Sequence, residues 1–307
     1  MGRFILVRLL QTIIALVGIS LLIFILVRVS GDPTILMRTS TTTEEEIANI
    51  KQVLGLDKSQ PEQYWIFVKN LAHGDLGESL IKRRPVIEMI GEALPISLKL
   101  ALSSFAVSML LSFVLGVLAA TRRDGWLDNG VKFLAVLGQA LPTFWVGIMA
   151  MFVFSVHWRL LPAAGTGNIA HFIMPVGTMS FFLLPGMMRL VRSSMLDVLD
   201  SEYIKLARIK GLPERMVIWK HALRNALITP LTTAGMLFAL LISGEVVIET
   251  VFNWPGIGRL SVEGMVARDF PVVQGVTLMV AALVLFLNLL VDILYAYVDP
   301  QIRYQRT

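Results

Sequence analysis

The sequence predicts an all-α integral membrane protein with six spanning helices. Hydrophobic residues make up 55% of its 307 residues and charged residues only 16%, and the mean hydropathy is +0.71. A soluble domain averages about 25% charged residues, so this chain has too few to cover a water-facing surface. A helix needs about 20 apolar residues to cross a bilayer, and six uncharged runs supply them: residues 9–27, 100–121, 133–156, 172–188, 227–244 and 272–291. The runs do not alternate in polarity, which excludes a transmembrane β-barrel.

The first run lies close to the N-terminus, behind Arg3 and Arg8, where a signal peptide would lie. It is longer than the 7–15 apolar residues of a signal peptide, and no small-residue cleavage site follows it. We therefore expect residues 1–29 to form the N-terminus and an uncleaved first span.

Positive charge in short loops marks the cytoplasmic side of a membrane protein. Lys and Arg gather after the second run, at Arg122, Arg123 and Lys132, and eight more lie between residues 189 and 224. The loops 157–171 and 250–271 carry one and two. We therefore expect both termini, including the tail 300–307, to be cytoplasmic. Residues 30–98 are expected to face out, because long loops cross largely regardless of charge.

The outer segment 30–98 contains two predicted short helices. The stretch "TTTEEEIANIKQVLGL" has Thr at a helix start, Glu three residues later and Gly55 as a stop. The stretch "PEQYWIFVKNLAHGDLG" predicts a second helix that ends near Gly74. Residues 99–299 then form the membrane core with the other five spans.

Residues 193–226, which we call the elbow, form a basic insert between the fourth and fifth spans. Helical spacing from Ser193 to Lys210 predicts that the fourth span continues as one helix into the cytosol. Gly211 suits a helix end, and Pro213 suits the first turn of a second amphipathic helix over 214–227. The residues alone leave three roles open: a loop that only fixes topology, a helix resting on anionic lipid, or a docking knob for a soluble partner.

Glu245 and Glu249 lie on one helical face near the outer end of the fifth run, because four residues separate them. Acids at membrane depth are costly and suggest function. We hypothesise that Glu245 faces a translocation path and meets a cationic group of the substrate. The alternative is that both acids lie just outside the hydrocarbon and pair with Arg259 or Arg268.

Prolines and a turn mark two further candidate regions. Pro142 and Pro185 can kink the third and fourth spans and so shape a path, although simple packing accounts for them equally well. The stretch "NWPGIG" predicts a tight outer turn. It is either a rigid reversal or a contact surface for a soluble partner, with these candidate residues: Asn253, Trp254, Pro255, Gly256 and Gly258.

Several function classes lack the residues that they need. The chain has no cysteine, its four histidines are scattered, and it has no G-x-x-x-x-G-K-[ST] loop to hold ATP, so we expect no metal site and no cofactor. No nucleophile–base set or H-E-x-x-H motif indicates an enzyme. The basic residues are spread over several loops, which argues against nucleic acid. A self-sufficient secondary transporter would need inverted repeats or an ion relay, and neither is evident.

The two halves of the elbow, "EYIKLARIKGL" and "HALRNALITPL", resemble the cytoplasmic loop of binding-protein-dependent ABC transporter permeases of the dipeptide/oligopeptide/nickel family. Thr229 before Pro230 is an insertion relative to that pattern. Of the more general E-A-A-x-x-x-G form only Ala207 and Gly211 match. Five further stretches resemble the family in the same order: "GDLGESL", "ALPTFWVGI", "IETVFNWPGIGRL", "RDFPVVQG" and "NLLVDILYAYVDPQIR".

The resemblance implies a permease of the type I ABC importer kind in a bacterial or archaeal inner membrane. It would pair with a second homologous permease, two ATPase subunits that bind ATP and Mg, and an extracytoplasmic solute-binding protein. Peptides are the expected substrate, with nickel complexes, glutathione or sugar derivatives as alternatives. Glu249 matches a family position, whereas Glu245 does not. The elbow would seat in an ATPase groove through these residues: Lys205, Leu206, Ala207, Arg208, Lys210, Gly211, Leu212 and Arg215.

Overall fold

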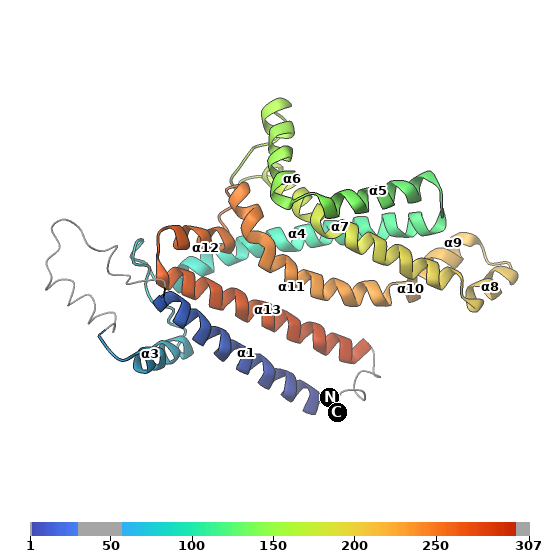
Figure 1. Ribbon diagram of the computed structural model, residues 1–307. Helices are drawn as coiled ribbons and strands as arrows, with labels where there is room; N and C mark the ends of the chain where they lie inside the picture. The colour runs from blue at the N-terminus through green and yellow to red at the C-terminus, as the bar shows by residue number, and fades with distance from the viewer. Residues whose placement is uncertain (1, 30–56, 299–307) are drawn as a thin grey trace. The chain divides into compact units, whose positions relative to one another are not determined.

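The computed structural model describes residues 2–29 and 57–298, and its regular elements are helices (Figure 1). Within them the β-structure amounts to one isolated bridge between Glu78 and Pro85. The all-α prediction is therefore confirmed. The predicted helix before Gly55 and the tail 300–307 lie outside the described residues. The chain forms two compact units, residues 1–96 with 255–289 and residues 97–254 with 290–307.

The first unit combines the N-terminal helix with the last one. Its helices are α1 (Gly2–Val29), α3 (Gln60–Ala72), the start of α4 (Val86–Thr121), α12 (Ile257–Val266) and most of α13 (Phe270–Val298). Ile23 and Val27 of α1 pack against Leu278 of α13 and are covered by Phe67 of α3. The helix predicted to end near Gly74 is α3, and Gly74 has the positive φ of 79° that favours glycine.

The second unit holds the rest of α4 and the helices up to the outer turn. They are α5 (Trp126–Ala140), α6 (Thr143–Ala150), the π-helix η2 (Met151–His157), α7 (Ile169–Leu199), α8 (Glu202–Ile209), α9 (Glu214–Met216), the π-helix η3 (Val217–Ala222), α10 (Leu223–Ala226) and α11 (Ile228–Val251). Helix α5 lies along α7 (Figure 1), and α7 is the helix from which the elbow extends.

Small side chains let α4 approach α7 closely. Ser104, Ser108 and Ser112 are buried and lie four residues apart, so they share one face of α4. Gly116 continues this face, and a Cβ there would lie 2.8 Å from the Cβ of Val191. Ser180 of α7 donates a hydrogen bond to the carbonyl of Ser104 at 2.9 Å. Small residues at such spacing are typical of tightly packed membrane helices.

The count of six spanning helices is not confirmed. By length and composition, four helices in the described part of the chain are long and apolar enough to cross a membrane: Ile5–Val29, Val86–Thr121, Ile169–Leu199 and Phe270–Ile293. A fifth is added if α5 and the α6–η2 helix count as one broken span. In α11 the apolar stretch found among the described residues is shorter, Ile228–Ala239.

The prediction of one helix over 133–156 is wrong, because α5 and the α6–η2 helix meet at 104°. The break falls at Leu141 and Pro142, and both residues have extended backbones. Proline offers no N–H to continue a helix and disfavours helical geometry in the residue before it. Pro142 therefore starts a new helix instead of kinking an existing one.

Candidate functional site

The corner of the elbow is a glycine-capped helix end. Gly211 has a φ of +77°, its N–H donates to the carbonyl of Arg208 at 2.9 Å, and the N–H of Leu212 donates to the carbonyl of Ala207 at 3.3 Å. This pair of bonds is the Schellman motif that ends many helices. A Cβ added at Gly211 would meet nothing within 4 Å, so the backbone conformation, and not space, requires glycine.

The two arms of the elbow differ from the predicted arms in one respect. The continuous helix predicted from Ser193 to Lys210 is wrong: α7 ends at Leu199, and α8 begins after Ser201, whose backbone is extended. The Ser201 hydroxyl donates to the carbonyl of Val198 at 2.5 Å, a local bond that competes with the helical ladder. The second arm, predicted over 214–227, is present as α9, η3 and α10 in succession.

The inner face of the elbow belongs to the core of the second unit. Ile204 and Ala207 of α8 and Val217 and Ala222 of the second arm are buried in one hydrophobic cluster. Residues of two long helices complete this cluster: Val117 and Ala120 of α4, and Val191, Met195 and Leu199 of α7. The elbow is therefore fixed to the ends of α4 and α7.

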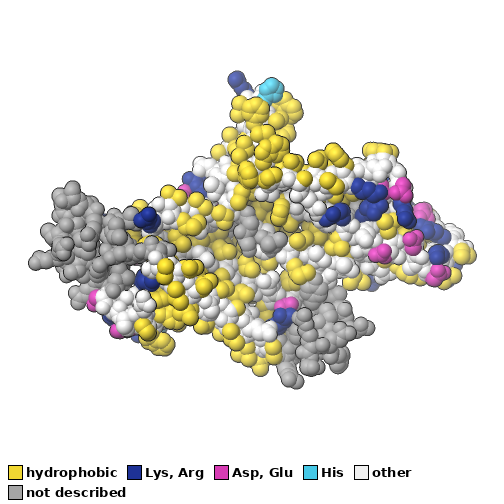
Figure 2. Space-filling model, viewed as in Figure 1, with side chains coloured by type: hydrophobic (Ala, Val, Ile, Leu, Met, Phe, Trp, Pro, Cys, Tyr) yellow, Lys and Arg dark blue, Asp and Glu magenta, His cyan; other side chains and the backbone are white. Residues whose placement is uncertain are grey.

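The outer face of the elbow combines exposed apolar and cationic side chains. Tyr203, Leu206 and Ile209 lie three residues apart on one side of α8 and are 42%, 55% and 80% exposed. Figure 2 shows Lys, Arg and acidic side chains over the start of α5 and over α8 and α9, among hydrophobic ones. Of the eight predicted coupling residues, Ala207 is buried and Leu212 half-buried, and six are exposed: Lys205, Leu206, Arg208, Lys210, Gly211 and Arg215.

Two exposed ion pairs cross this outer face. Arg208 donates to both carboxylate oxygens of Glu214, at 2.8 and 3.2 Å, and so links α8 to the second arm across the corner. This hydrogen bonding lowers the pKa of Glu214 and raises the pKa of Arg208. Lys205 donates to Glu202 at 2.8 Å, which raises the pKa of Lys205. These pairs hold the cations in place but leave them open to water.

A cavity of about 490 Å³ lies farther along α5 and α7 from the elbow, at the break between α5 and α6. Pro142 lines it, and Gln139 and Thr143 contribute polar groups. The wall is completed by residues of α5, α6, α7 and α11: Gly138, Leu141, Phe144, Phe182, Leu183, Gly186, Leu237 and Val247. Its size and mostly apolar lining suit a small organic solute.

Pro185 packs against Gly138, which is one of the residues of this wall. It is buried in α7, and a Cβ on Gly138 would lie 2.2 Å from its ring Cγ. Glycine at 138 is therefore what lets α5 contact α7 at this point. Pro142 therefore lines the cavity, whereas Pro185 packs against Gly138 at the contact between α5 and α7.

Of the two acids of α11, the structure describes the side chain of Glu249 and not that of Glu245. Glu249 is fully buried in the second unit, and the Ser97 hydroxyl donates to its Oε1 atom. A carboxylate held in this way costs less to bury than an isolated one. The side chain of Glu245 lies outside the described residues, so its predicted place on the path stays a prediction.

The outer-turn candidates are partly exposed and partly buried. Trp254 is fully buried in the second unit, with its ring edge-to-face against Phe172 at 4.7 Å between centroids. Asn253 is exposed and has a φ of 52°. Pro255 is exposed, whereas Gly256 and Gly258 are buried. Asn253 and Pro255 are therefore the ones with side chains at the surface.

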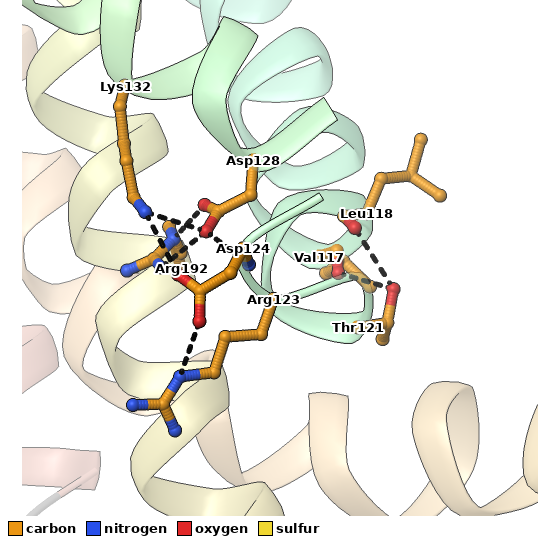
Figure 3. A network of polar contacts seen from close by, with 8 residues as sticks. All are labelled: Val117, Leu118, Thr121, Arg123, Asp124, Asp128, Lys132 and Arg192. Atoms are coloured by element: carbon orange, nitrogen blue, oxygen red, sulfur yellow. Dashed lines mark hydrogen bonds and ion pairs between the residues drawn. The ribbon is translucent and has the colours of Figure 1, made fainter. Parts of the chain in front are cut away.

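An ion-pair network around a buried carboxylate joins α5 to α7, and the sequence did not reveal it (Figure 3). Asp128 is fully buried, and Arg192 donates to its two carboxylate oxygens at 2.5 and 2.8 Å. Lys132 approaches the same carboxylate at 2.9 Å, and the N–H of Asp124 donates to it at 3.0 Å. The spacing of Asp128 and Lys132 suggests only an ordinary helical pair. Nothing in the sequence connects them to Arg192.

Among the described residues, no group of three or more His, Asp or Glu side chains lies where it could hold a metal ion.

Two family models together match nearly the whole chain. Residues 112–304 match the binding-protein-dependent transport system inner membrane component, and residues 1–101 match the N-terminal part of such membrane components. A relative from Brucella abortus (strain 2308), named for a peptide transport system permease, is 41% identical over 99% of this chain and all of its own length.

Other relatives carry a different substrate name. The glutathione transport system permease protein GsiC of Pectobacterium atrosepticum is 39% identical over 97% of this chain and 98% of its own. Among solved structures, an amino acid ABC transporter with histidines matches with a TM-score of 0.55, covering 67% of this chain and 92% of its own. At 13% identity, that match shows a shared fold only.

Proposed function

Because the chain belongs to the family of binding-protein-dependent transport system inner membrane components, a family of ABC importer permeases, we propose that it forms half of an ATP-driven translocation path for peptides. Di- and oligopeptides are the first substrate class, because a relative is named for peptide transport. Glutathione, itself a small peptide, is the second, because other relatives are named for it.

The elbow is the observation that carries this proposal. Its inner face is built into the ends of α4 and α7, while Leu206 and Ile209 stay exposed outside the core. A short helix with an exposed apolar stripe fits a groove on a partner protein. We infer that the partner is one of two ATPase subunits, which hold the ATP and Mg, and that this face is cytoplasmic.

The cavity at the break between α5 and α6 supports the path itself. Among the described residues, its lining carries the polar groups of Gln139 and Thr143 and no charged side chain. These polar groups can hydrogen-bond a peptide backbone, whatever the side chains of the peptide are. The proposed solute-binding protein would then set selectivity, and the second, homologous permease would supply the other half of the path.

The outer surface has its own proposed partner. Asn253 and Pro255 are exposed on the outer turn, where the solute-binding protein would deliver its solute. Both termini lie on the inner side in this proposal.

The test uses the whole transporter, reconstituted in liposomes from two permeases, two ATPases and the binding protein. We expect ATP-dependent uptake of a labelled dipeptide, competed by unlabelled peptide. Uptake by this chain alone, without ATPases, would refute the proposal and support a secondary transporter.

The docking face is tested separately by Ile209→Asp. Placing a charge in an apolar contact should reduce the ATPase that co-purifies by about tenfold or more, as expected at a buried interface position. Trp126→Asp is the matched control, since Trp126 is 79% exposed on α5 outside the elbow. Equal loss in both variants would contradict a docking role for α8.

A further inference from the structure

The buried pair of Asp128 and Arg192 lies between the elbow and the cavity in the second unit. Arg192 occupies the stretch of α7 whose neighbours Val191 and Met195 pack against the elbow. Any displacement of the elbow core therefore acts on the segment of α7 that carries Arg192.

Helix α5 carries the other partner and reaches the cavity. Asp128 lies in its first turn, and Gly138, Gln139 and Leu141 at its far end line the cavity wall. Between them, Val131 and Ala135 pack against Met188 of α7. Because the chain turns by 104° at Leu141 and Pro142, α5 is a separate rod that ends at the cavity.

Contacts along this rod are of two kinds. Small apolar side chains such as Ala135 make dispersion contacts, each of which is individually weak. The Arg192 guanidinium and the Asp128 carboxylate form a fixed two-point fork, which resists both sliding and rotation. The fork is thus the contact best suited to transmit movement from α7 to the base of α5.

We propose that Asp128 and Arg192 are positioning residues that tie α5 to the elbow-bearing part of α7, so that displacement of the elbow by its partner moves the cavity wall. This inference rests on the proposed function, because it takes the elbow as the point where the ATPases act. It assigns to the pair a role in coupling besides its role in stability.

The test reads the cavity wall directly and does not depend on substrate. The chain has no cysteine, so Gln139→Cys places one thiol of this chain on the wall. In the full transporter, with partner subunits free of reactive thiols, ATP should change the rate at which a maleimide modifies this thiol by about fivefold or more. Adding Asp128→Asn should reduce that change to less than about twofold, while the ATPases still bind and hydrolyse ATP.

Asp124→Asn is the matched control. Asp124 lies in the turn just before α5, its side chain is 77% exposed, and its φ of 61° is one that asparagine tolerates. It should keep the full ATP response. Asp128→Glu, which keeps the charge, should restore most of the response, whereas a merely structural role would change complex yield and leave the ATP response of the assembled complex unchanged.

Each result decides the proposal. A full ATP response in assembled Asp128→Asn complexes overturns it, as does the absence of any ATP response in the parent protein. If Asp128→Asn does not assemble, Arg192→Lys decides, since lysine keeps the charge but cannot form the fork: a full response overturns the tie and a reduced one supports it. If ATP changes the modification rate of the Gln139→Cys thiol but no peptide is taken up, the proposal of a peptide substrate fails. The proposed tie between Asp128 and Arg192 is then unaffected.

Discussion

Two of the arginine–carboxylate pairs in the second unit connect separate helical segments and differ mainly in burial. Arg192 and Asp128 join α7 to α5, with the carboxylate fully buried and contacted also by Lys132 and a backbone N–H. Arg208 and Glu214 join the two arms of the elbow, with side chains 41% and 55% exposed. These two pairs thus share the same fork of hydrogen bonds, one on a buried carboxylate and one on an exposed carboxylate.

This difference separates a permanent contact from an exchangeable one. Removing one member of a buried pair leaves a desolvated charge without its partner, which is strongly unfavourable. An exposed pair can exchange its partner for water or for a charged group of another protein at little cost. The buried pair therefore suits a fixed tie, and the exposed pair suits a surface that meets a partner.

The largest expected effect comes from Asp128→Ala. The change leaves Arg192, whose side chain is 19% exposed, without its carboxylate partner, and we expect a loss toward the upper end of about 1–3 kcal/mol in the free energy of unfolding. Thermal denaturation of the purified protein measures it as a lower Tm. If Asp128→Ala cost no more than Glu214→Ala, burial would not distinguish the two pairs.

An intermediate effect is expected from Gly211→Ala. Alanine at a φ of +77° costs about 1–2 kcal/mol, and it strains the corner that brings Arg208 to Glu214. Gly130→Ala is the control, because Gly130 is helical, without a positive φ, and a Cβ there meets nothing within 4 Å. We expect the control to leave the Tm unchanged or raise it. A corner set by the ion pair alone would be insensitive to Gly211→Ala.

The smallest effect is expected from titration of the exposed pair. The lowered pKa of Glu214 means that its contribution to stability is present above its unfolded value of about 4.3 and is lost as the pH falls through the folded pKa. Between pH 5 and 8 this pair should therefore leave the Tm unchanged. Glu214→Gln should shift stability by less than about 1 kcal/mol and remove the acid-side dependence. A large Tm change near neutral pH that Glu214→Gln abolishes would contradict this.

The sequence predicted features that depend on local residue types. The long apolar helices, the glycine corner at Gly211 and the second amphipathic arm follow from composition, backbone preference and helical period. The breaks were harder to predict, because a proline within an apolar run permits both a kink and a new helix. At Pro142 a new helix begins, because the backbone of Leu141 is extended. The close contact of Gly138 with Pro185, which joins α5 to the separate helix α7, accompanies this break.

The features that the sequence did not reveal depend on distant residues. Asp128 and Arg192 are separated by 64 positions, and the buried environment that makes their pairing strong arises only when α5 packs along α7. In the same way, Glu249 is on α11 and its hydroxyl partner Ser97 is on α4, at a separation of 152 residues. Period and spacing in a single sequence do not encode such pairings.

The order of the chain gives the hydrophobic cluster beneath the elbow one further property. All of its buried members, from Val117 to Ala226, precede α11 in the chain. The contacts of Gly235 with Val291 and of Ser97 with Glu249, by contrast, require residues that are synthesised later. During translation the elbow can therefore complete its core while the C-terminal quarter of the protein is still on the ribosome, and its outer face is formed before the permease has all of its membrane helices.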